Sequence, residues 1–256
     1  MWSALLLLTA LQTELAPGTT YDPSVPTLEQ VVGHDFGEEL STHAQIGRYL
    51  GALHEAEPDR TRLLEYGASW EGRRLLVLVV ASPERIARLD EIQTDLQRLA
   101  RAEADASSLV ATLPVVSWFA HSVHGDELSS SDAALAEAYH LLAARGDEAV
   151  DTILRESIVL IDPLQNPDGR ERFLFNNLMA RGHPPDRLPV AAEHDETWPS
   201  GRVNHYLFDL NRDWVVQSQV EAAARRKLWL SFRPHVSADL HEMGGVAGIT
   251  ARATYY

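Results

Sequence analysis

Two histidines and one glutamate in this sequence could together hold a metal ion. His124 and Glu127 are three residues apart in His-Gly-Asp-Glu, and His241 follows far downstream in Ala-Asp-Leu-His. Two His and one Glu are a known ligand set for a catalytic zinc, with a fourth position open for water or substrate. Each part alone is a weak signal, because a His near a Glu is common at a helix start and a strand-end His is commonly a hydrogen-bonded core residue. Asp239 is either a partner of His241 on the same strand face or a solvated strand-end charge.

Between these residues lies a stretch rich in groups that bind anions. Residues 201–214 read Gly-Arg-Val-Asn-His-Tyr-Leu-Phe-Asp-Leu-Asn-Arg-Asp-Trp. The guanidinium groups of Arg202 and Arg212 offer paired donors that match a carboxylate, and Asn211 adds an amide. Such groups can hold a substrate carboxylate or stabilise an oxyanion. The alternative is that a solvated loop carries its usual share of Arg and Asn.

The polar segments each follow a predicted strand, and the first two of these strands are apolar runs. Predicted strands over 114–120, 157–164 and 235–240 end at His124, at Asn166-Pro-Asp-Gly169 and at His241. The Asn-Pro-Asp-Gly sequence indicates a turn. Ligands of open α/β sheets bind beyond the carboxyl ends of the strands, so we expect three segments to deliver their polar residues to one sheet edge.

The remaining pattern alternates between helices and strands. Apolar spacing predicts helices over 40–56, 83–104, 129–144 and 217–232, and a strand hairpin over 62–66 and 74–81. The uniformly apolar run 75–80 indicates a strand covered on both faces. Residues 170–208 are expected to form a long irregular loop, which is usually functional in a compact domain. The sequence thus predicts an α/β fold, a mostly parallel mixed sheet with helices on both faces.

The amino-acid composition argues against several classes of function. The chain has 256 residues, of which 45% are apolar, enough for a substantial core. Its 22 Lys and Arg against 37 Asp and Glu give a net charge of −15, which argues against nucleic acid and against an anionic membrane surface as partners. The lack of cysteine excludes disulfides, thiolate catalysis and cysteine-ligated metal. The oligomeric state is left open.

The N-terminus has the pattern of a secretory signal. The apolar run 4–11 is too short to span a bilayer and fits the central region of a signal peptide over 1–16, although no Lys or Arg precedes it. The alternative is a frayed apolar tail or a short buried helix. We therefore expect a secreted or periplasmic protein with no membrane insertion after cleavage, and a Pro-rich linker over 17–39 before the main domain.

In order and spacing, these motifs resemble the zinc carboxypeptidase family, of carboxypeptidase A and B type. The resemblance covers roughly 40–242 and rests on His124-Gly-Asp-Glu127, Asn166-Pro-Asp-Gly169, Gly201-Arg202, Phe208-Asp-Leu-Asn-Arg-Asp-Trp214 and His241. The spacing of the two arginines is similar to that of the regulatory-type branch.

The resemblance implies a function and a role for each site residue. His124, Glu127 and His241 would bind Zn²⁺, and Arg202 would polarise the scissile carbonyl and hold the oxyanion. Asn211 and Arg212 would bind the C-terminal carboxylate of a peptide or protein substrate. The implied activity is hydrolysis of C-terminal peptide bonds by zinc-activated water.

Two departures from the family pattern affect the expected activity. Asp126 stands where digestive members carry Arg, which alters a subsite contact. The family's general-base Glu and capping Tyr would lie beyond Tyr256, and Glu242, on the opposite strand face from His241, is a poor substitute base. We therefore expect a catalytic domain over 40–256 that is truncated at its C-terminus. The alternatives are a catalytically dead fragment that binds zinc and peptide carboxylates, and an amidase or deacylase acting on amino-acid conjugates.

Overall fold

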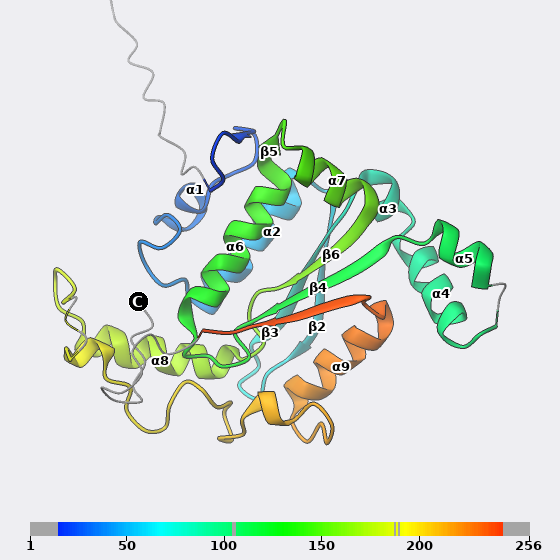
Figure 1. Ribbon diagram of the computed structural model, residues 1–256. Helices are drawn as coiled ribbons and strands as arrows, with labels where there is room; N and C mark the ends of the chain where they lie inside the picture. The colour runs from blue at the N-terminus through cyan, green and yellow to red at the C-terminus, as the bar shows by residue number, and fades with distance from the viewer. Residues whose placement is uncertain (1–14, 104–105, 187, 189, 243–256) are drawn as a thin grey trace, which may run out of the picture.

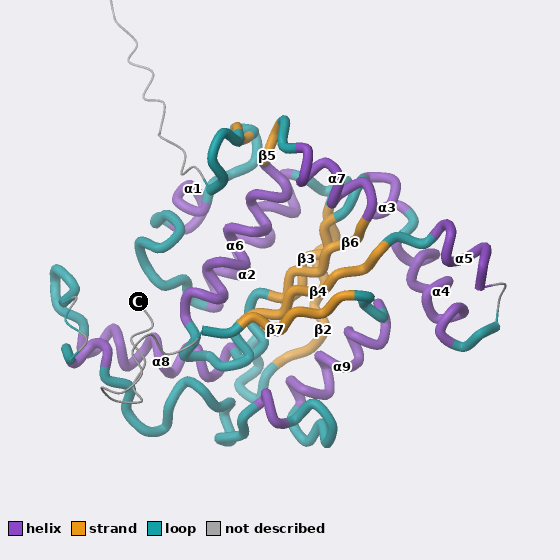
Figure 2. The backbone as a smooth tube through the Cα atoms, in the orientation of Figure 1, coloured by secondary structure: helices purple, strands orange, loops and turns teal. Residues whose placement is uncertain are grey.

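The computed structural model describes residues 15–103, 106–186, 188 and 190–242. Figures 1 and 2 show a twisted sheet with helices against both of its faces. Across the sheet the strands are β2 (Thr61–Ala68), β3 (Arg74–Val80), β6 (Ser157–Asp162), β4 (Val115–His121) and β7 (Val236–Leu240). β4 is parallel to both β6 and β7, whereas β3 is antiparallel to both of its neighbours. Only β3 therefore opposes the common strand direction, which confirms the predicted mostly parallel mixed α/β sheet.

Both faces of the sheet are buried, because alternate side chains of β3 enter two separate cores. Leu76, Leu78 and Val80 pack with α2 (His43–Ala56), α6 (Leu128–Ala143) and α7 (Glu148–Glu156). Val77 and Val79 pack on the other face with α3 (Pro83–Ala87), α4 (Leu89–Ala100) and α9 (Val220–Phe232). The uniformly apolar run 75–80 was correctly predicted as a strand covered on both sides.

Several predicted element boundaries need correction. The single helix predicted over 83–104 is two helices, α3 and α4, separated at Arg88, whose φ of −105° leaves the helical conformation. The stretch predicted as linker contains α1 (Leu28–Val32), which Thr27 and Gln30 begin with a capping box. Four further elements were not predicted: α5 (Ala106–Thr112), α7, and the strands β1 (Thr20–Tyr21) and β5 (Ala144–Arg145) that pair with each other.

Asn166-Pro-Asp-Gly169 begins a helix and does not form the predicted turn. The Asn166 side chain accepts a hydrogen bond of 3.0 Å from the Gly169 amide, and Pro167 occupies the first helical position of α8 (Pro167–Ala180). Both features are favoured at a helix N-terminus as well as in a turn, which is why the sequence pattern was ambiguous. The predicted loop 170–208 is therefore helical in its first part, and a 3-10 turn, Ala192–His194, lies further along it.

Glycines let two loops and the first turn of α8 meet at the carboxyl edge of the sheet. The Gly125 amide donates to the Gly201 carbonyl at 2.9 Å. A Cβ on Gly125 would overlap the backbone of Gly169 and Arg170, and a Cβ on Gly169 would overlap the Gly201 carbonyl. Close backbone approach therefore accounts for the glycine in each of the three motifs.

The predicted signal peptide and the last residues of the predicted catalytic domain fall largely on 1–14 and 243–256, outside the described residues. No helix in the described part of the chain has both the length and the apolar character needed to cross a membrane.

The glycine contacts yield a stability prediction. Gly125→Ala should lower the free energy of unfolding by about 1–3 kcal/mol, because the new methyl group must push rigid backbone apart. Gly51→Ala, within α2 and facing open space, should raise it by about 0.5–1 kcal/mol. Urea denaturation of the two variants checks this, and equal stability of Gly125→Ala and the unchanged chain would contradict the close approach.

Candidate metal centre

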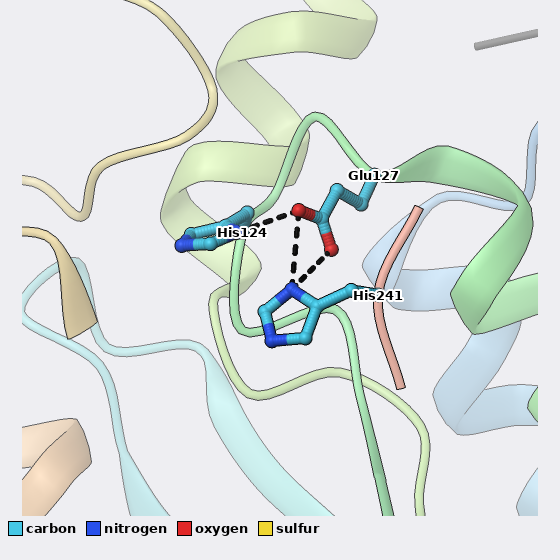
Figure 3. Close-up of side chains that lie close together, drawn as sticks. All are labelled: His124, Glu127 and His241. Atoms are coloured by element: carbon cyan, nitrogen blue, oxygen red, sulfur yellow. Dashed lines mark hydrogen bonds and ion pairs between the residues drawn. The ribbon is translucent and has the colours of Figure 1, made fainter. Parts of the chain in front are cut away.

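The structure brings His124, Glu127 and His241 together around a single carboxylate (Figure 3). Glu127 Oε1 lies 2.6 Å from His124 Nδ1, and Glu127 Oε2 lies 2.9 Å from His241 Nδ1. One potential ligand atom from each residue lies within 4.8 Å of the other two. His124 and Glu127 are buried, whereas His241 is partly exposed. The three residues therefore form a compact cluster with one side open to solvent.

Strand register explains how residues far apart in sequence meet here. His124 and Glu127 lie in the loop between β4 and α6, and His241 directly follows β7. β4 and β7 pair in parallel, with His121 opposite Leu240, so the two strands end at the same level. The sequence prediction that these segments share one sheet edge is confirmed.

Each histidine has a second carboxylate on its far nitrogen. His124 Nε2 lies 3.1 Å from Asp209 Oδ1, and His241 Nε2 lies 3.2 Å from Asp239 Oδ2. Each imidazole therefore lies between two carboxylates, which can accept from its ring N–H groups and fix the orientation of the ring. Of the two alternatives for Asp239, the structure supports the histidine partner. Asp209 was not predicted as a site residue; the only sequence signal was its position beside Asn211 in the Asp-Leu-Asn-Arg stretch.

This arrangement suits a zinc ion. Two imidazole nitrogens and one carboxylate oxygen converge, and His241 is partly exposed to solvent. The surroundings also favour positive charge: burial opposes protonation of His124, but the hydrogen bond and charge of Glu127, with Asp209, outweigh it and raise the pKa of His124 above 6.5. The donor set and its charge therefore fit a divalent cation.

The structure places the predicted catalytic residue, Arg202, and the predicted substrate-binding residues, Asn211 and Arg212, at different depths. Arg202 contacts Asp209 Oδ2 at 2.9 Å and His124 Nδ1 at 3.2 Å. Asn211, in the 3-10 turn η2 (Leu210–Arg212), lies with Nδ2 3.3 Å from His241 Nε2. Arg212 is exposed and donates to the Asn211 carbonyl, so it lies at the rim. Since a bound cation would repel Arg202, we expect this partly exposed side chain to turn toward the substrate.

Asp126, between the two predicted ligands in sequence, is buried and hydrogen-bonded to Glu196. Burial, reinforced by the neighbouring Asp126 charge, raises the pKa of Glu196 to about 8. Burial likewise raises the pKa of Asp126. The two carboxyl groups therefore share a proton at neutral pH. Sequence analysis missed Glu196, because nothing in the local pattern of residues 191–200 distinguishes it from a solvated loop charge.

The sheet, its polar edge and the His-Glu-His cluster define a candidate metal site on an α/β fold. Residues 46–244 match the family model described as zinc carboxypeptidase, and the chain belongs to that family. No curated protein sequence matches the chain.

Solved structures of carboxypeptidases share the fold. Carboxypeptidase A from Helicoverpa armigera has a TM-score of 0.55 at 16% identity, over 85% of this chain and 48% of that one. A protein from Burkholderia mallei assigned as a carboxypeptidase has a TM-score of 0.53 at 16% identity, over 80% of this chain and 40% of that one. Thrombin-activatable fibrinolysis inhibitor has a TM-score of 0.50 at 15% identity, over 79% and 48% of the two chains. At these identities the likeness shows the fold alone, and this chain spans about half the length of these structures or less.

Removal of one cluster residue should abolish tight zinc binding. His124→Ala, Glu127→Gln or His241→Ala should each weaken zinc affinity by more than about 100-fold, beyond the effect of losing an outer hydrogen-bond partner. Competition with a chromophoric chelator measures the affinity. His43→Ala is the control, because His43 lies on α2 and bonds to the Arg74 carbonyl. Unchanged zinc affinity in any of the three cluster variants would contradict the site.

The Asp126–Glu196 pair predicts how stability depends on pH. The pKa of Glu196 rises from 4.5 to about 8 on folding, so the folded chain keeps a proton that the unfolded chain releases. Stability should therefore fall as pH rises from about 5 to about 8. Glu196→Gln should reduce that fall by about 1–2 kcal/mol, less than the full shift implies because the pair is partly solvated.

Urea denaturation across this pH range tests the prediction. Glu148→Gln, which removes an exposed carboxylate from α7, is the matched control for charge. Parallel pH profiles for Glu196→Gln and the unchanged chain would show that the carboxyl pair does not share a proton.

Proposed function

We propose that this protein is a zinc-dependent metallocarboxypeptidase that removes residues from the C-termini of peptides or proteins. The observation that carries the proposal is the His124–Glu127–His241 cluster, with Arg202 beside it, in a chain that belongs to the zinc carboxypeptidase family. The apolar run near the N-terminus supports export, so we propose secreted or periplasmic substrates.

The site residues would have different roles according to their positions. His124, Glu127 and His241 would hold zinc, which supplies a polarised carbonyl and an activated water. Arg202, partly exposed beside the cluster, can swing to donate to the oxyanion that forms on the substrate. Asn211 and Arg212 lie further out and offer an amide and a guanidinium to the substrate's terminal carboxylate.

One observation favours a second candidate, a protein that binds zinc and peptide carboxylates without hydrolysis. Carboxylates near the cluster are already engaged: Asp209 with His124 and Arg202, and Asp239 with His241. Glu242 accepts from the Ser129 amide at 2.8 Å. Within the described residues, these groups are held by partners rather than positioned to activate water.

Kinetics on peptides with free and amidated C-termini separate the two candidates. The carboxypeptidase should cleave the free peptide and spare the amidated one. Arg202→Met should lower kcat by about 100–1000-fold, since it removes an oxyanion donor. Arg212→Met should chiefly raise KM, because its guanidinium would contact the substrate carboxylate in both ground and transition states.

The control is Arg98→Met on α4, whose guanidinium pairs with Asp95. Stoichiometric zinc and tight binding of the free peptide, with no product by mass spectrometry, would instead establish the binding protein. A chain that binds neither zinc nor peptide would refute both candidates.

A further inference from the structure

Arg225 is a buried residue that is linked by hydrogen bonds to the metal centre. Neither the family motifs nor the local sequence pattern identified it. It lies on α9 with 2% of its surface exposed. Burial opposes its charge and lowers its pKa, and the charges of Asp239, Asp162 and Asp213 offset this only in part. Its guanidinium carbon lies 3.8 Å from the centroid of the Trp214 ring. Burying a charge is costly unless it is well hydrogen-bonded, so the contacts of this side chain show what it supports.

One set of contacts leads to His241. Arg225 NH1 donates to Gln165 Oε1 at 2.7 Å, and Gln165 Nε2 lies 3.3 Å from Asp239 Oδ1. The other Asp239 oxygen lies 3.2 Å from His241 Nε2. A guanidinium can only donate, so Gln165 must accept through its oxygen and donate through its nitrogen. Asp239 can therefore accept from Gln165 on one side and from His241 on the other, which holds the His241 ring in its orientation toward Glu127.

A second contact leads to His124. Arg225 NH2 donates to the Leu210 carbonyl at 3.0 Å. Leu210 lies between Asp209, which contacts His124 Nε2, and Asn211. The Trp214 ring beneath the guanidinium donates from Nε1 to Asn211 Oδ1 at 3.2 Å. One guanidinium therefore holds both the turn that supports His124 and the hydrogen-bond chain that supports His241.

We propose that Arg225 is a positioning residue that orients both zinc-binding histidines, His241 through Gln165 and Asp239, and His124 through the turn at Leu210. The inference rests on the proposed zinc site. Lysine would not replace it, because only a planar guanidinium can reach two acceptors and also stack on Trp214.

The test compares Arg225→Met and Arg225→Lys with Leu228→Ala in the full chain. Leu228 lies on the same helix in the core and has no polar link to the site, so its variant matches the loss of packing. We expect both Arg225 variants to bind zinc about 10-fold more weakly, the lower end of the range for outer partners of metal ligands. Their cobalt(II) derivatives should show altered visible absorption bands. Leu228→Ala should lose stability to urea yet keep its zinc affinity within about twofold and its cobalt spectrum unchanged.

A double variant directly tests the hydrogen-bonded link from Arg225 through Gln165 to His241. If Arg225 acts on His241 through Gln165, the combined loss of zinc affinity in Arg225→Met with Gln165→Met should be smaller than the two single losses added. Long-range NMR of ¹⁵N-labelled histidine reports the hydrogen bonding of each ring nitrogen without any metal. We expect the ring ¹⁵N signals of His241 to shift in Arg225→Met and to stay unchanged in Leu228→Ala.

The outcomes separate failure of this inference from failure of the proposed function. Unchanged zinc affinity, cobalt spectrum and His241 ¹⁵N signals in Arg225→Met would overturn the inference, as would equal losses of zinc affinity in Leu228→Ala. If the unchanged chain bound no zinc, the proposed function would fail, and the ¹⁵N signals of His241 would alone decide the role of Arg225.

Discussion

The parallel pairing of β4 with both β6 and β7 is the constraint on which the site depends. Ala120 of β4 lies opposite Asp162 of β6 and Asp239 of β7, so all three strands end at one level. Backbone contacts continue past the strand ends, where the Gln165 amide donates to the His121 carbonyl. A register slip of one residue in β7 would turn Asp239 and its neighbours to the opposite face of the sheet. The His124–Glu127–His241 cluster therefore depends first on strand register and only then on side-chain chemistry.

The cluster also shows how buried charge is balanced at this edge. Glu127 is buried beside two imidazoles, and Asp209 and Asp239 lie behind them. Grouping three carboxylates in a region of low dielectric is unfavourable unless positive charge offsets them. Arg202 and the protonation that Glu127 favours on His124 provide part of that charge. The negative charge at this edge thus favours a bound cation, and the residues that carry it are of the types that zinc prefers as ligands.

Those parts of the fold and of the site that follow from apolar periodicity and strand direction could be predicted from the sequence. Apolar runs located β3, β4 and β6, a strand was also correctly predicted at β7, and the strand-end rule correctly grouped His124 with His241. Local chemistry was ambiguous at Asn166, where the same residues favour a turn and a helix start. Glu196 and Arg225 could not be predicted, because their importance comes from partners far away in the chain. Contacts between residues far apart in the chain produce no periodic pattern in a single sequence.

The two histidines differ in how firmly the fold holds them. His124 is buried and follows β4, which is paired on both sides. His241 follows β7, which pairs with β4 alone among the described strands, and its side chain is 25% exposed. A strand fixed along one edge restrains its backbone less than an interior strand does, so more of the orientation must come from side-chain hydrogen bonds. Gln165 and Asp239 meet that requirement by linking His241 to α9, which Leu228 and Phe232 anchor in the core. Side-chain hydrogen bonds to a core helix thus add to the backbone restraint that β7 places on His241.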